Sequence, residues 1–94
     1  GHTRHHIAVR VESAGEVLYF VADAFIHPAY VEYPQWVFPV DIDGDVAVET
    51  RRALTAQIAE EKALMLGYHF AFPGLARVYA DDNGFTCEVE AITA

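Results

Sequence analysis

The histidines and one aspartate are the residues of this chain whose types and spacing suit metal chemistry. The histidines are His2, His5, His6, His27 and His69. Neutral imidazoles and carboxylates are the ligands that suit Zn²⁺, Mn²⁺, Fe²⁺ or Co²⁺. His2 precedes one expected strand, whereas Asp23 and His69 each follow one, so the three side chains can meet at one edge of a sheet. A single histidine is more often a surface or hydrogen-bonded residue, and the early cluster could also be the remnant of a purification tag.

Length, composition and charge limit the classes of protein that fit. The chain has 94 residues, of which 53% are hydrophobic, so we expect one small folded domain over 1–94 rather than a disordered segment. The formal net charge is −8, which argues against a nucleic-acid or anionic-membrane surface. No apolar run approaches the roughly 18 residues of a membrane helix, and no signal-peptide pattern is present.

The single cysteine, Cys87, excludes an internal disulfide and a cysteine-based zinc site. It lies in a strand pattern and is most simply a small core residue. One free thiol together with an acidic balance favours a cytoplasmic location.

The first part of the chain predicts a β-hairpin followed by a long aromatic loop. Residues 6–13 alternate between apolar and polar, which is typical of a half-buried strand. Residues 16–22 are almost wholly apolar, which favours a strand buried on both faces. Residues 24–45 contain three prolines and many aromatic side chains and are expected to be irregular. Loops of this length are often functional.

The second part predicts one helix and three further strands. Residues 46–62 carry an apolar stripe at helical spacing, and acidic residues stand where its N-cap belongs. The stripe consists of Ala47, Leu54 and Ile58 with Ala53 beside it, and the acidic residues are Asp43 and Asp45. Residues 63–67 suggest a short buried strand, and 75–80 and 85–90 a hairpin around Asp81–Gly84. We therefore expect an α/β fold, a mixed sheet with one main helix on one face and a second apolar face that lacks a covering layer.

Three segments in order resemble the metallo-β-lactamase fold. Gly1-His2-Thr3 before a hairpin resembles that fold's "G-H-T" segment, and Ala22-Asp23-Ala24 is similar to its strand-end aspartate. The run from Leu66 to Gly74 is similar to the "H-x-P-F-P-G" segment of the methyl parathion hydrolase and quorum-quenching lactonase branch, as is the Val46–Leu54 helix with its paired arginines. The "H-x-H-x-D-H" motif with which the family begins does not occur in these residues. The resemblance thus covers only the C-terminal half of the αββα sandwich, and we expect a fragment lacking the N-terminal half.

The resemblance implies a set of metal ligands. In whole members two metal ions lie between two sheet-and-helix layers, and the missing motif supplies four ligands. The remaining three correspond to His2, Asp23 as the bridging carboxylate, and His69. Two divalent ions, zinc first and iron, manganese or cobalt as alternatives, would generate hydroxide that attacks an ester, lactone or phosphotriester. A half-site with three ligands is expected to bind metal weakly or not at all.

The chain also departs from the family's pattern. Arg4-His5 replaces the usual Pro-Gly, Ala22 replaces a Gly and Ala71 a Pro. Some lactonases place a tyrosine three residues after the bridging aspartate, where this chain has Ile26, which argues against lactonase activity of that type. His27 follows and is expected near the pocket rather than on a metal.

Two functional hypotheses from different classes follow. The first is a dinuclear metal-dependent hydrolase of a small molecule whose complete form is active and whose fragment is inactive. The side chains expected on its substrate side or directly behind its metal ligands are His27, Phe25, Tyr30, Trp36 and Phe72. The second is a non-catalytic module that buries its open sheet face against another copy, as a homodimer or larger assembly. An unrelated α/β domain with incidental histidines is a third, less favoured interpretation.

Overall fold

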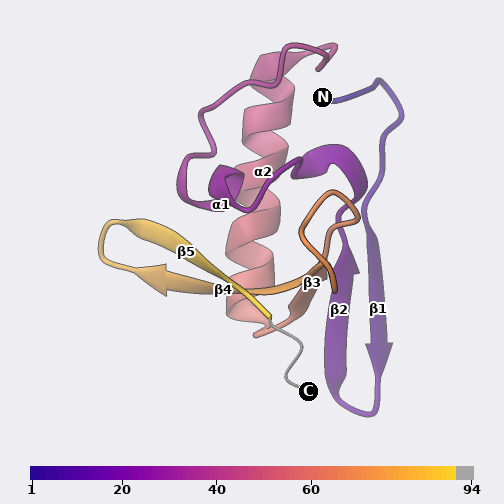
Figure 1. Cartoon of the computed structure of the whole chain (residues 1–94), viewed down its shortest axis with the longest axis vertical. Coiled ribbons are helices and arrows are strands. Elements are labelled where there is room, and N and C mark those ends of the chain that lie inside the picture. Colours follow the sequence, from indigo (N-terminus) through magenta and orange to yellow (C-terminus); the bar gives the residue numbers. More distant parts are fainter. Residues whose placement is uncertain (91–94) are drawn as a thin grey trace.

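The computed structural model describes residues 1–90 as a mixed five-stranded sheet with one long helix against it (Figure 1). The elements in chain order are β1 (Val9–Ser13), β2 (Glu16–Phe20), the 3-10 turn η1 (Ala22–Ala24), α1 (Ala29–Glu32), α2 (Gly44–Glu60), β3 (Leu64–Leu66), β4 (Leu75–Asp81) and β5 (Gly84–Val89). The strands lie in the order β1-β2-β3-β4-β5, and β2 and β3 are parallel while the other pairs are antiparallel. This confirms the expected α/β fold with one main helix.

The strand register divides the sheet into two unlike faces, because residues directly opposite on neighbouring strands share a face. Tyr19, Met65 and Ala76 are opposite one another on three strands and are buried in the core. Val9, Phe20 and Leu66 also pair across three strands but lie on the other face, where no described element covers them. The expected uncovered apolar face is therefore present in residues 1–90.

The uncovered face explains two predictions that were wrong. All five residues of β1 are exposed, so the strand is not half-buried, although Val9 and Val11 do share a face. In β2 only Tyr19 is buried, and Phe20 is 37% exposed, so this strand is not buried on both faces. The apolar pattern of β1 and β2 is typical of strands in a sheet that is covered on both faces. Residues 1–90 cover one face of the sheet only.

Helix α2 begins at an N-cap that the sequence predicts. The side chain of Asp43 accepts a hydrogen bond from the backbone N–H of Val46 at 3.2 Å, which starts the helix two residues earlier than expected. The helix ends at Glu60, and Lys62 beyond it has a positive φ of 53°.

The buried face of α2 differs from the predicted stripe. Ile58 and Ala47 are buried, and Leu54 is half-buried against the core. Ala53 is exposed, so its expected place beside the stripe is wrong. Two polar side chains that the apolar pattern does not include, Arg51 and Thr55, are instead buried on this face.

The long segment between β2 and α2 is less irregular than expected. It contains the one-turn helix α1, which starts after Pro28 and is capped by His27, whose Nδ1 accepts a hydrogen bond from Ala29 N–H at 3.0 Å. Val31 of α1 is buried in the core, and α1 lies against β5. The segment is thereby anchored to the sheet.

None of the helices described in residues 1–90 combines the length and the apolar character that crossing a membrane requires.

Candidate metal centre

The parallel pairing of β2 and β3 brings Asp23 and His69 together. Phe20 is paired with Leu66, and Asp23 and His69 each follow their strand's paired residue by three positions. Parallel strands end at the same sheet edge, so equal offsets place both side chains there. Asp23 lies in η1, and His69 lies in the turn that follows β3.

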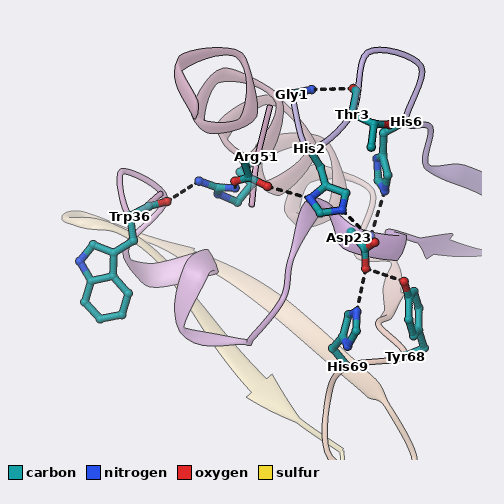
Figure 2. Close-up of polar contacts among 10 residues, drawn as sticks. Gly1, His2, Thr3, His6, Asp23, Trp36, Arg51, Tyr68 and His69 are labelled. Carbon is teal, nitrogen blue, oxygen red and sulfur yellow. Dashed lines mark hydrogen bonds and ion pairs between the residues drawn. The ribbon is translucent and has the colours of Figure 1, made fainter. Parts of the chain in front are cut away.

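The three residues predicted as metal ligands converge on the Asp23 carboxylate (Figure 2). His69 Nε2 lies 2.7 Å from Oδ1 of Asp23, and His2 Nε2 lies 3.1 Å from Oδ2. His2 arrives from the segment before β1, so three distant parts of the chain meet here. Each imidazole therefore contacts a different oxygen of one carboxylate.

Two residues that the sequence reasoning did not assign complete the contacts of Asp23. The hydroxyl of Tyr68 donates a 2.5 Å hydrogen bond to Oδ1, and the backbone N–H of Asp23 donates to Nε2 of His6 at 3.0 Å. The bond from Tyr68 lowers the pKa of Asp23, and His69 and His2 act in the same direction against desolvation. Burial lowers the pKa of His6. Tyr68 stands beside His69 in the segment that resembles the family, which is the signal that could have pointed to it.

A buried ion pair lies behind His2 and was also missed. Asp41 Oδ1 lies 2.8 Å from Nδ1 of His2, and its second oxygen is 3.8 Å from a terminal nitrogen of Arg51. The side chains of Asp41 and Arg51 are each only 1% exposed. The segment before α2 contributes Asp41 and the helix itself contributes Arg51, so the start of α2 supports the site.

The turn from β3 to β4 holds His69 in place. Gly67 donates a backbone hydrogen bond to the carbonyl of Gly74 at 2.8 Å, and Gly74 has a positive φ of 79° that favours glycine. A Cβ on Gly67 would lie 2.8 Å from the ring of Phe70. The two glycines therefore permit a tight turn around the buried Phe70, which leaves Tyr68 and His69 at the sheet edge.

The donor atoms around Asp23 suit the metal ions that the resemblance implies. A carboxylate with one imidazole at each oxygen has the donor types and arrangement of a bridging ligand between two divalent ions. Asp41 at Nδ1 supplies the carboxylate–histidine contact that accompanies most metal-binding histidines. Within residues 1–90, no group of three or more such side chains is already arranged around one ion position. The residues present fit part of a dinuclear site.

The side chains predicted on the substrate side do not gather in one place. Phe25 is fully buried in the core. Trp36 is 48% exposed and stacks on Tyr33 with ring centroids 4.5 Å apart. Tyr30 meets Trp36 edge to face at 6.2 Å.

The other two residues predicted on the substrate side lie apart from that aromatic cluster. His27 is exposed at the start of α1, where it caps the helix. Phe72 is 85% exposed in the β3–β4 turn. It borders a surface hollow of about 310 Å³ that Tyr68 also lines.

Two solved structures share the fold of this chain. No protein-family model matches the chain, and no curated protein matches it. The structure of AidC, a dizinc quorum-quenching lactonase in complex with a product, superimposes with a TM-score of 0.90 and 29% identity. AbOPH, a hydrolase in the beta lactamase superfamily, gives a TM-score of 0.90 and 26% identity.

Both matches cover all of this chain but only part of the other protein. The chain spans 32% of the AidC chain and 33% of the AbOPH chain. About one third of each neighbour is matched, and the strand order and the single long helix α2 belong to that matched part. The chain has the fold of the C-terminal part of a metallo-β-lactamase domain.

Proposed function

We propose that this chain forms the C-terminal part of a dinuclear metal-dependent hydrolase that acts on esters, lactones or organophosphates. The observation that carries the proposal is the Asp23 carboxylate with His2 at one oxygen and His69 at the other. The solved neighbours support it, since one is a dizinc lactonase and the other a hydrolase. The methyl parathion hydrolase and lactonase branch is the finer assignment that we propose.

The three side chains would divide the metals between them. His2 would hold one ion, His69 the other, and Asp23 would bridge them and set their separation. Two bound divalent ions, zinc first, lower the pKa of water and polarise the electrophilic oxygen of the substrate. Three ligands on one layer leave both sites incomplete, so we expect residues 1–94 alone to bind metal weakly and to lack turnover.

The substrate would approach from the side on which His69 and Tyr68 are exposed. Phe72 projects into solvent beside them and borders the hollow near Tyr68, so it is suited to contact an apolar group of the substrate. We assign a more distant role to Trp36 and Tyr30, which form an aromatic cluster with Tyr33 on the loop before α2. His27 caps α1 and is proposed to shape the loop.

The proposal is tested by metal content and hydrolysis. The complete product of the gene that contains this sequence is purified, and its zinc, iron, manganese and cobalt are measured by mass spectrometry. It is then assayed on aryl esters, acyl-homoserine lactones and phosphotriesters. We expect about two metals per chain and turnover that Asp23→Asn abolishes, whereas Asp43→Asn, the same charge change at the α2 cap, leaves turnover intact. A metal-free product without turnover on all three classes contradicts the proposal.

A second candidate, self-association, is favoured by the open sheet face. This face carries eight apolar side chains in register, none of them buried. They are Val9, Val11, Leu18, Phe20, Leu64, Leu66, Leu75 and Tyr79. Arg77, opposite Leu64, lies among them. A largely apolar uncovered face of this kind marks an interaction surface.

In this candidate the chain is a non-catalytic module, and two copies would bury the open face against each other as a symmetric dimer. Light scattering at micromolar concentration should then give twice the chain mass, and Val11→Lys should give the monomer. Val40→Lys, at an exposed position outside the sheet, is the control. A folded wild-type monomer contradicts self-association and leaves the hydrolase proposal unaffected.

A further inference from the structure

The imidazole of His2 lies between two carboxylates, and this arrangement decides which ring nitrogen can bind a metal ion. Nε2 faces Asp23 at 3.1 Å, and Nδ1 faces Asp41 at 2.8 Å. An ionised carboxylate only accepts hydrogen bonds, so the nitrogen that contacts Asp41 must carry a proton. The same rule applies to Asp23, so Nε2 donates to it in the metal-free chain. A metal ion that displaced this proton would bind the Nε2 lone pair, while Nδ1 kept its bond to Asp41.

Arg51 lies on the other side of Asp41, whose second oxygen is buried without a hydrogen bond from residues 1–90. Its guanidinium donates to the carbonyl of Pro34 through Nε at 3.3 Å and also bonds the carbonyl of Trp36. The same group lies 5.0 Å above the ring of Tyr30 and 3.8 Å from Asp41. A buried charge is costly unless it is paired, so each member of the Asp41–Arg51 pair requires the other.

The backbone brings Asp41 to His2 as well. Ile42 N–H donates to the carbonyl of His2 at 3.1 Å, and Asp43 N–H donates to the carbonyl of Gly1 at 2.8 Å. A Cβ on Gly1 would lie 2.1 Å from the backbone nitrogen of Ala47, so only glycine fits against the first turn of α2. The chain before β1 is thereby held against the residues on which Asp41 stands.

We propose that Asp41 and Arg51 are positioning residues: the Asp41 carboxylate accepts a hydrogen bond from Nδ1–H of His2 and so leaves Nε2 as the ring nitrogen that can bind a metal ion. The metal-binding role of His2 rests on the proposed function, whereas the position of the proton on its ring does not. The same Arg51 contacts tie the loop at Pro34 and Trp36 to the ligand, so the orientation of His2 and the position of that loop depend on one buried pair.

The test replaces Asp41 by its uncharged isostere. In Asp41→Asn the amide oxygen should turn toward the Arg51 guanidinium, which leaves the amide NH₂ against Nδ1 of His2. Nδ1 must then accept, so that only Nε2 carries a proton. Nitrogen-15 spectra of histidine-labelled, metal-free chain report this directly, with the His2 signals identified by their loss in His2→Gln. Asp43→Asn is the matched control, since asparagine caps a helix as well as aspartate does.

We expect protonated Nδ1 in the wild type and in Asp43→Asn, and unprotonated Nδ1 in Asp41→Asn. Zinc titration of the complete gene product by calorimetry should show affinity about 10- to 100-fold weaker in Asp41→Asn than in Asp43→Asn. An unprotonated Nδ1 in the wild type overturns the inference even if the variant does not fold, and so does an Asp41→Asn spectrum like that of the wild type. If the complete gene product binds no zinc, the metal-centre proposal fails, and the nitrogen spectra still decide the role of Asp41.

Discussion

The hydroxyl of Tyr68 and the carboxylate of Asp23 form a 2.5 Å hydrogen bond between residues 45 positions apart in the chain. Tyr68 also packs against the ring of His69, with centroids 4.2 Å apart. Tyr68 therefore holds both the carboxylate and one of its two imidazole partners. It lowers the pKa of Asp23, and Asp23 in turn raises the pKa of Tyr68.

Tyr68→Phe removes this donor and keeps the ring. We expect the pKa of Asp23 in the metal-free chain to rise toward its ordinary value of 3.8, with His69 and His2 retaining part of the lowering. A group with a lowered folded-state pKa stabilises the fold above its unfolded pKa and loses that effect as pH falls through the folded value. The free energy of unfolding of the wild type should therefore exceed that of the variant above pH 3.8, and the difference should shrink below that pH. Carbon-13 spectra of the Asp23 carboxyl group give the pKa, and Tyr79→Phe, at an exposed position of β4, should leave it unchanged.

Glu61 supplies a second pH-dependent contact at the far end of α2. Tyr19 donates to its carboxylate at 2.6 Å and Arg10 at 3.1 Å, which lowers the pKa of Glu61 below 4.5. Stability from this carboxylate is present above pH 4.5 and is lost as pH falls through the folded-state value. Glu61→Gln should thus lower the urea midpoint at pH 6 and converge with the wild type in acid. Glu60→Gln, one residue away and exposed, is the comparison; an equal effect of the two substitutions contradicts the assignment.

Cys87 should react slowly with alkylating reagents. Its side chain packs against the core, and burial raises the pKa of the thiol to about 11. Only the thiolate reacts, so at pH 8 alkylation by iodoacetamide should be about 100-fold slower than for the same chain in urea. Equal rates in the folded and unfolded chain would show that the thiol is not shielded.

Ile58 and Ile42 offer a matched test of the core. Ile58 is fully buried on α2, whereas Ile42 is 73% exposed before the helix. Ile58→Ala should lower the free energy of unfolding by about 2–5 kcal/mol, because it removes buried methyl groups and leaves a cavity. Ile42→Ala should change it by less than about 0.5 kcal/mol. Urea unfolding monitored by circular dichroism measures both, and similar losses would place the core elsewhere.

Much of the fold is predictable from local patterns. The Asp43 cap, the helix that follows it and the hairpin around Asp81–Gly84 depend on neighbours in sequence, and the structure confirms each. The burial of β1 and β2 was predicted wrongly, because burial depends on what covers a face. An alternating strand such as Val9–Ser13 has the same sequence with or without a second layer.

The sequence predicts a residue of the candidate site only where that residue lies in a segment that resembles the family. Resemblance singled out His2, Asp23 and His69, and the structure brings these three together. It could not single out Asp41 and Arg51, because each has the residue type of an ordinary surface charge. Their contact joins a loop to a helix residue ten positions later in the chain. Partners of this kind become visible only when both side chains are seen to be buried.

The parallel pairing of β2 with β3 also determines when the site can form during folding. The two strands are separated in sequence by the whole of η1, α1 and α2, and a contact across so long a loop is slow to close. Asp23 and His69 each lie three residues beyond this pairing, so neither can meet the other before the crossover is complete. The Asp23–His69 contact is therefore a reporter of the long-range pairing of β2 with β3, and a nascent chain has no assembled site until β3 has been synthesised and has joined the sheet.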